Sequence, residues 1–346
     1  MFKKHLHTVF RKDNIENKSQ YSFCLTQNER NLEIDQQIFK SFIHSITQED
    51  IRFYPNLGTI KSKLADNLKL SPNNILLTPG SDTAIKTLFE AIDFENGHFI
   101  TTDYHFPMYS VYGRLYNIPG TFINYSSDLT YSVPDIISSI TDKTKLVILS
   151  NPNSPLGDYK SFTQLKPLLE TGIPILIDEA YIELTPNESL LKHIHTYSNL
   201  FITRTFSKGL GAAGTRVGYI VSNSKNIEVL NKFRFMYEIP GISAKYVEII
   251  LDQKEYFTQY CQSTVTGKTQ LVEILKRNKV FEIVDTDCSW FFIKSTPKLV
   301  KLLNRYKVGV RELVLPGQSA EYIKFNYDPI LEGSGFLKEL SNENLN

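Results

Sequence analysis

Cysteine is scarce in this chain, which has three cysteines among its 346 residues. Cys24, Cys261 and Cys288 are far apart in the sequence and odd in number. Such a pattern predicts neither a disulfide framework nor a cysteine metal site, and we expect no metal ion. A chain without a disulfide framework suits a reducing compartment, so we expect a cytoplasmic protein.

Long apolar runs and an excess of one charge are also lacking. Lys and Arg number 38 and Asp and Glu 37, which gives a net charge of +1. A nearly neutral chain has no general attraction to nucleic acid or to an anionic membrane. The apolar runs are too short to span a bilayer, and the basic start MFKKHLHTVFRKDN has no apolar signal core. We therefore expect a small-molecule partner, with no nucleic acid and no membrane.

The middle of the chain alternates between strand and helix patterns. The predicted strands are residues 74–78, 98–103, 120–125, 145–150, 173–180 and 199–204. The predicted helices between and before them are residues 60–70, 82–92, 107–117, 133–140 and 162–170. This alternation predicts an α/β fold, with a mostly parallel sheet flanked by helices. Ligands of such sheets gather beyond the carboxyl ends of the strands.

The rest of the chain has a different pattern. Residues from about 225 to about 275 are predicted to be helical, and strand patterns follow at 281–294, 308–316 and 321–327. This predicts a smaller α+β domain, and 346 residues suit two domains. We expect a large domain at 46–240 and a small domain at 241–346, to which residues 1–45 contribute.

The most informative segment is TFSKGLGAAGTRVGY, Thr205 to Tyr219. The hydroxyl groups of Thr205 and Ser207, together with Arg216, can hold a phosphate. The amine of Lys208 lies between them in sequence and can form a Schiff base with a carbonyl. Pyridoxal phosphate (PLP) carries an aldehyde and a phosphate, so it fits both groups.

The same segment contains a competing motif. Gly209–Gly214 matches the dinucleotide fingerprint G-x-G-x-x-G, and Glu228 lies nineteen residues after Gly209. The glycines of that fingerprint follow the strand directly, whereas here TFSK intervenes. We therefore disfavour a nicotinamide site.

Asp178, at the end of a predicted strand, has two interpretations. It is either a helix cap or surface turn residue, or the partner of the PLP ring nitrogen, which it keeps protonated. Tyr181 follows three residues later, and Lys208 comes after the next strand. The combination favours the functional interpretation.

Five motifs in order carry a resemblance to a known family: YP, TPGSDTAI, NPNSPLG, IDEAY and TFSK…AGTRVGY. The chain resembles the fold-type I PLP-dependent aminotransferases of class I/II, and within them the histidinol-phosphate aminotransferase branch. The resemblance extends from about residue 25 to about residue 328. It implies an aspartate aminotransferase-like fold, PLP as the cofactor, and a homodimer with shared active sites.

The resemblance also implies roles for individual residues. Lys208 bonds to the cofactor and later moves a proton, Asp178 pairs with the ring nitrogen, and Tyr181 donates a hydrogen bond to the ring hydroxyl. The residues implied to surround the cofactor phosphate are Gly80, Ser81, Asp82, Thr205, Ser207 and Arg216. The first three lie at a predicted helix N-terminus, which offers backbone N–H groups to an anion.

Three further cofactor contacts leave alternatives open. Tyr54 resembles the tyrosine that reaches the cofactor of the neighbouring subunit, and otherwise is a turn aromatic. Phe106 matches an aromatic that stacks on the cofactor ring, and otherwise is a core aromatic. The family motif NPNNPTG reads NPNSPLG here, so either Asn153 or Ser154 contacts the ring hydroxyl; we choose Asn153.

The C-terminal region departs from the family pattern. The family places an arginine in its last strand to hold the substrate carboxylate, and the matching residue in YIKFNY is Lys324. A lysine holds a carboxylate as a point charge, without the two-pronged contact of arginine; it is otherwise a plain strand lysine. Arg311, in VGVREL, matches an arginine near the substrate phosphate in the histidinol-phosphate branch.

Three functions remain open at this point. The first is an aminotransferase acting on a small amino acid or amine, which we expect to be phosphorylated. The second is a PLP-dependent decarboxylase of a phosphorylated amino acid, of the threonine-phosphate or serine-phosphate type, because a loosely held carboxylate is easier to expel. The third is a non-catalytic module that kept the fold. The sequence does not identify the amino donor or acceptor.

Overall fold

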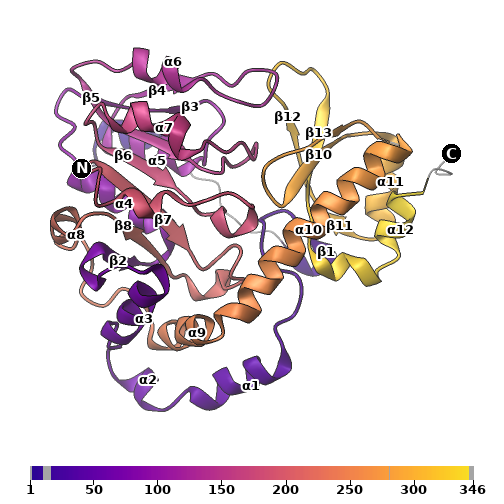
Figure 1. Ribbon diagram of the computed structural model, residues 1–346, viewed down its shortest axis with the longest axis horizontal. Helices are drawn as coiled ribbons and strands as arrows, with labels where there is room; N and C mark the ends of the chain where they lie inside the picture. The colour runs from indigo at the N-terminus through magenta and orange to yellow at the C-terminus, as the bar shows by residue number, and fades with distance from the viewer. Residues whose placement is uncertain (1, 11–16, 280, 343–346) are drawn as a thin grey trace.

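Two regions of the chain lie side by side (Figure 1). The computed structural model describes residues 2–10, 17–279 and 281–342. Within these residues, one region is built on a seven-stranded sheet and the other on a four-stranded sheet. The predicted fold class is confirmed: a large α/β region with a mostly parallel sheet, and a smaller α+β region.

The large sheet has the strand order β2-β8-β7-β6-β5-β3-β4. Its strands are β2 (Ile75–Thr78), β3 (His98–Thr102), β4 (Gly120–Ile123), β5 (Thr144–Ser150), β6 (Ile175–Asp178), β7 (Leu200–Thr205) and β8 (Gly218–Val221). The pairs from β4 through β7 are parallel, and β8 is antiparallel to both of its neighbours. The sequence pattern missed β8, because a short apolar run directly after a glycine-rich segment has no strand periodicity.

Helices cover both faces of the large sheet. In β5, Leu146 and Ile148 pack on one side, and Val147 and Leu149 pack on the other. The first side is covered by α4 (Gly80–Ala91), α5 (Met108–Tyr116) and α8 (Ser224–Leu230). The second is covered by α3 (Gly58–Leu68), α6 (Val133–Ser138), α7 (Phe162–Leu169) and α9 (Gly241–Asp252). The strands are therefore apolar on both faces, as expected of a buried parallel sheet.

The small sheet is antiparallel, with the order β12-β13-β10-β9. Its strands are β9 (Ile283–Val284), β10 (Trp290–Lys294), β12 (Arg311–Val314) and β13 (Glu321–Asn326). One face packs on α10 (Lys254–Asn278), α11 (Pro297–Arg305) and α12 (Phe336–Leu340). Phe291 and Phe325 lie on this helical face, whereas Trp290 and Phe292 belong to the core of the large region. Alternation along the strands therefore turns one face of the small sheet toward the large sheet.

The N-terminal part of the chain contacts both regions. Strand β1 (Phe23–Cys24) pairs in parallel with β11 (Val308–Gly309) of the small region. The 3₁₀-helix η1 (Lys4–Thr8) contacts α5, and α1 (Gln36–Ser45) contacts α9, as does α2 (Glu49–Arg52). The domain boundaries after residues 45 and 240 remain our proposal.

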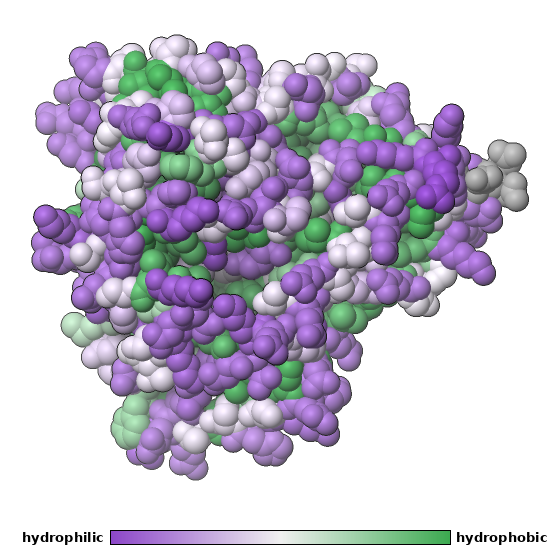
Figure 2. Space-filling model, in the orientation of Figure 1, coloured by the Kyte–Doolittle hydropathy of each residue, from purple (hydrophilic) through white to green (hydrophobic). Residues whose placement is uncertain are grey.

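Six further short 3₁₀-helices connect these elements within the described residues. They are η2 (Lys18–Gln20), η3 (Pro72–Asn74), η4 (Ile182–Leu184), η5 (Leu190–His193), η6 (Ala213–Thr215) and η7 (Pro329–Gly333). On the face shown in Figure 2, hydrophilic residues predominate and apolar residues form smaller patches between them. No helix in the described part of the chain is long and apolar enough to cross a membrane.

Candidate active site

Three neighbouring strands bring polar side chains to one edge of the large sheet. Ser150 of β5 lies opposite Asp178 of β6, and Asp178 lies opposite Thr203 of β7. Lys208 follows the end of β7 by three residues. The parallel order of these strands therefore places Asp178 and the lysine segment at the same edge, as the sequence predicted.

Asp178 is a buried carboxylate held by three hydrogen bonds. Its Oδ2 accepts a bond of 2.8 Å from the Tyr109 hydroxyl, and its Oδ1 accepts bonds from Thr203 Oγ1 at 3.0 Å and Ala180 N at 3.2 Å. Burial raises the pKa of Asp178, and the bonds from Tyr109 and Thr203 oppose this rise. None of these three hydrogen-bond donors is a cation. A buried carboxylate of this kind is stabilised when a ligand brings a positively charged group beside it.

Sequence reasoning missed Tyr109. Its ring is fully buried, and its hydroxyl also bonds to Ser150 Oγ at 2.8 Å. Phe106, the predicted stacking residue, contacts the Tyr109 ring edge to face at a centroid distance of 5.8 Å. In the sequence, Phe106 and Tyr109 are recognisable only as two aromatic residues near the start of a predicted helix. That position does not indicate that Tyr109 would bond to Asp178.

The predicted phosphate-binding residues come together where α4 begins. Arg216 Nη1 donates to Ser207 Oγ at 3.3 Å, and Thr205 Oγ1 accepts from the Ser207 backbone N at 3.1 Å. A Cβ atom on Gly80 would lie 2.9 Å from Arg216 Nη2, so the guanidinium lies against the first residue of the helix. The cradle therefore combines a guanidinium, a hydroxyl and the N-terminus of a twelve-residue helix, a donor set that fits a phosphate.

Glycine at 218 makes this arrangement possible. A Cβ atom there would lie 2.5 Å from both Gly80 C and Ser81 N, so only glycine lets β8 pass beside the helix start. The third predicted member of this helix start, Asp82, accepts a bond of 2.7 Å from the Tyr112 hydroxyl. Asp82 also raises the pKa of Asp178, after the stronger effect of burial.

Lys208 is half-buried, and its amine donates a bond of 2.7 Å to the carbonyl of Gln27. The same amine lies 5.5 Å from the centre of the Tyr181 ring. Residues 209–217 form turns and η6 without an α-helix, so the glycines do not open a helix as a dinucleotide fingerprint does.

Tyr181 lies between the two sheets. Its ring contacts Trp290 edge to face at 5.1 Å, and Lys324 Nζ lies 5.9 Å from its centre. Trp290 also donates from Nε1 to the carbonyl of Pro155 at 3.0 Å. The sequence did not single out Trp290, although it is the sole tryptophan of the chain.

The two predicted substrate residues are direct neighbours in the small sheet. Arg311 of β12 lies opposite Lys324 of β13. Arg311 is exposed, whereas Lys324 is 5% exposed. Opposite residues of an antiparallel pair project from the same face of a sheet. Lys324 also lies opposite Phe292 of β10, so Arg311 and Lys324 both project from the face that carries Phe292 and Trp290.

Asn153 is 1% exposed, and both ends of its amide are bonded to backbone. Its Nδ2 donates to Tyr104 O and its Oδ1 accepts from Leu156 N, each at 2.9 Å. It therefore shapes the loop in which it lies. Ser154 is more exposed, so the choice between the two as a cofactor contact stays a prediction.

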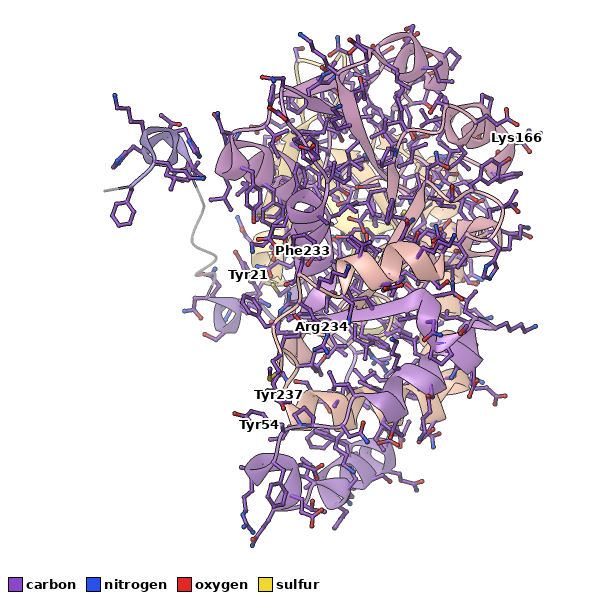
Figure 3. All side chains as sticks on the ribbon, turned by 90° about the vertical axis from the view of Figure 1, so that its left-hand side faces the viewer. Tyr21, Tyr54, Lys166, Phe233, Arg234 and Tyr237 are labelled. Atoms are coloured by element: carbon purple, nitrogen blue, oxygen red, sulfur yellow. The ribbon has the colours of Figure 1, made fainter. Side chains whose placement is uncertain are left out.

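Tyr54 lies away from these residues. Its side chain is 72% exposed and stacks on Tyr237 at a centroid distance of 3.7 Å. Figure 3 shows both rings on the side of the molecule that also carries Phe233 and Arg234. Its stacking partner Tyr237 is not one of the predicted site residues.

The assembled residues fit PLP by their chemistry. The cradle at Gly80, Ser207 and Arg216 suits the phosphate, Lys208 suits the aldehyde, and buried Asp178 suits the ring nitrogen. In the described residues there is no group of three or more His, Cys, Asp or Glu that could hold a metal ion.

The sequence matches the family described as aminotransferase class I and II over residues 23–328. The histidinol-phosphate aminotransferase of Clostridium novyi (strain NT) is 27% identical, covering 79% of this chain and 78% of that protein. The histidinol-phosphate aminotransferase of Christiangramia forsetii is 30% identical and covers 69% of each chain.

Two solved structures share the fold. One is a histidinol-phosphate aminotransferase from Sinorhizobium meliloti in complex with pyridoxal-5'-phosphate, with a TM-score of 0.79, 16% identity and 98% of both chains covered. The other is the L-threonine-O-3-phosphate decarboxylase from Porphyromonas gingivalis, with a TM-score of 0.76 and 20% identity. That match covers 92% of this chain and 98% of the other.

Proposed function

The chain belongs to the class I and II aminotransferase family, and on that premise we propose that it is a PLP-dependent aminotransferase of a small, phosphorylated amino acid or amine. One observation carries the proposal: Lys208, buried Asp178 and the Arg216 cradle occupy one edge of one sheet. The relatives named histidinol-phosphate aminotransferase support the same activity.

When bound, PLP supplies an aldehyde for the substrate amine and a ring that accepts electrons. Asp178 would hold the ring nitrogen in its protonated form, because a buried carboxylate stabilises a positive charge beside it. Tyr181 would donate a hydrogen bond from its hydroxyl to the ring hydroxyl. Lys208 would act as the positioned amine base that takes a proton from, or returns it to, the substrate carbon.

Substrate selection is assigned to the small sheet. Arg311 receives the substrate phosphate, and Lys324 takes the place of the arginine that holds the carboxylate in the family. A phosphate carries more negative charge than a carboxylate, so a single ammonium group binds a phosphate more firmly than a carboxylate. The exposed position of Arg311 supports contact with an incoming ligand.

Decarboxylation of a phosphorylated amino acid is the second candidate. Lys324 favours it, because one ammonium holds a carboxylate less firmly than the fork of arginine does. The balance between the two reactions depends on how firmly that carboxylate is held.

We also propose a cytoplasmic homodimer with shared active sites. The three cysteines are free, which suits a reducing compartment. Tyr54 lies on an exposed side and is assigned to the cofactor of the partner copy.

The test starts with the covalent bond to Lys208. Borohydride reduction should fix PLP to the wild-type protein and not to Lys208→Ala. A reducible adduct that persists in the variant would falsify the assignment. Adding phosphorylated amines and amino acids one at a time, while following the cofactor spectrum and carbon dioxide release, then separates transamination from decarboxylation.

A further inference from the structure

Lys324 is a buried amine without an acidic partner. It lies on β13, and its side chain is 5% exposed. Among the ion pairs of the described residues, none involves Lys324. A buried ammonium without a counter-ion is unstable, so the position favours either the neutral amine or an arriving anion.

In place of an acidic partner, the Lys324 amine contacts the indole ring of Trp290. Lys324 Nζ lies 3.8 Å from the centre of that ring, so an uncharged amine there can point an N–H group at the ring face. Trp290 is fully buried and is fixed by its bond to Pro155 and by the edge of Tyr181. The Trp290 ring is therefore a fixed contact surface for the Lys324 amine, next to Tyr181.

The surroundings of Lys324 disfavour its charged form. Burial is the largest cause that lowers the pKa of Lys324, to about 7, and the cations Lys208 and Arg311 lower it further. Only the charged thiolate of Cys288 would act in the opposite direction. Burial also raises the pKa of this thiol, so Cys288 stays uncharged near neutral pH and supplies no counter-ion.

We propose that Trp290 and Lys324 form an anion-gated pair: the Lys324 amine rests on the Trp290 ring while the site holds no anion, and takes up a proton and leaves the ring to meet the anionic group of the substrate. The proton comes from solvent, and no covalent bond forms or breaks. This inference rests on the proposed function, because it assigns the pair to the substrate site. Trp290 acts through Lys324 and is a positioning residue.

The pair makes anion binding dependent on pH. An anion stabilises the ammonium, so the pKa of Lys324 rises in the complex. Below about pH 7 the amine already carries its proton, and binding takes up little. Above that value, affinity falls by about tenfold per pH unit, because each complex must first gain a proton. An arginine would stay charged and give no such slope.

The single tryptophan allows a direct test. In the holoenzyme labelled with 5-fluorotryptophan, the one ¹⁹F resonance reports on the Trp290 ring. A titration from about pH 6 to about pH 9 should move it with a midpoint below that of an ordinary lysine. Excess sulfate, a dianion that does not itself titrate in this range, should raise that midpoint by at least about one unit.

Three variants make the test decisive. Lys324→Met should remove the titration, and Lys324→Arg should keep a sulfate response that is independent of pH. Lys294→Met removes a half-exposed lysine of the same strand as Trp290, paired with Glu282, and should behave like the wild type. A titration that survives in Lys324→Met, or a midpoint that sulfate leaves unchanged, overturns the proposal.

The readout does not depend on turnover. If the ¹⁹F titration behaves as expected and no amino transfer is found, the proposed function fails and the anion-gated pair stands as a binding device. If amino transfer is found with a flat titration, the pair fails and the proposed function stands.

Discussion

The amine of Lys208 donates a hydrogen bond of 2.7 Å to the backbone carbonyl of Gln27. Gln27 belongs to a segment that the small region holds at both ends. Leu25 N donates to Gly309 O at 2.8 Å, and Asn31 N donates to Asp328 Oδ2 at 2.8 Å. The bond therefore ties the lysine of the large sheet to a segment anchored on the small sheet.

Loss of this bond should loosen the segment around Gln27. In the cofactor-free protein, Lys208→Met keeps the length of the side chain and removes its donor. We expect faster hydrogen–deuterium exchange of the amides of residues 25–31, by roughly tenfold, which corresponds to one lost hydrogen bond of ~1.4 kcal/mol. Lys208→Arg keeps a donor and serves as the control. Equal exchange in the wild type and Lys208→Met would show that the bond does not hold the segment.

Asp178→Asn should bind PLP and lose most of its turnover. An amide cannot keep the ring nitrogen protonated, so we expect a fall in kcat of roughly 100-fold or more. Tyr109→Phe removes one of the three bonds to this carboxylate and should have a smaller effect, with a further rise in the pKa of Asp178. Cofactor titration and steady-state kinetics measure both. Near-normal turnover of Asp178→Asn would reduce the residue to a structural role.

Arg311 and Lys324 should separate two kinds of substrate. Arg311→Ala should lower kcat/KM for a phosphorylated substrate by roughly tenfold, ~1.5 kcal/mol, at the low end for a charge-assisted bond because the side chain is exposed. Lys324→Arg should improve unphosphorylated dicarboxylic or aromatic amino acids relative to the phosphorylated substrate. A silent Arg311→Ala, together with a wild-type preference for unphosphorylated amino acids, contradicts the phosphate assignment.

Glu183 should make the free energy of unfolding depend on pH. Burial raises its pKa from 4.5 to about 7, with partial opposition from Arg204. Between these values the folded protein binds more protons than the unfolded chain, so the free energy of unfolding falls as pH rises from about 4.5 to about 7. Glu183→Gln should flatten this fall in urea unfolding near pH 5 and near pH 8. Glu188→Gln, at a 79% exposed side chain, is the control and should retain it.

The exposed side that carries Tyr54 should be a dimer interface. Tyr237 is 51% exposed, and Met236 beside it is 74% exposed. Tyr237→Asp places a charge in that apolar surface and should shift sedimentation from dimer to monomer and reduce activity. Lys166→Asp changes a charge on the opposite side of the molecule and should stay dimeric (Figure 3). A fully active wild-type monomer in solution scattering would rule out a shared site.

Much of this organisation could be predicted from the sequence. The strands ending at Ser150, Asp178 and Thr205 followed from local apolar patterns, as did the helix that begins near Gly80. Lys208 and Arg216 are eight residues apart, with hydroxyl residues before the lysine. The amine and the phosphate-binding groups could therefore be predicted from a single segment. Strand β8 was missed because its four residues are too few to show a period.

The sequence by itself determined the alternating elements and the identity of the reactive groups, because both depend on neighbours along the chain. Only the tertiary structure decided which groups meet. Tyr109 reaches Asp178 across 69 residues, and Lys208 reaches Gln27 across 181. Lys324 rests on Trp290 because two antiparallel strands turn the same face toward the large sheet. Such contacts follow from packing of whole elements, and no local pattern encodes them.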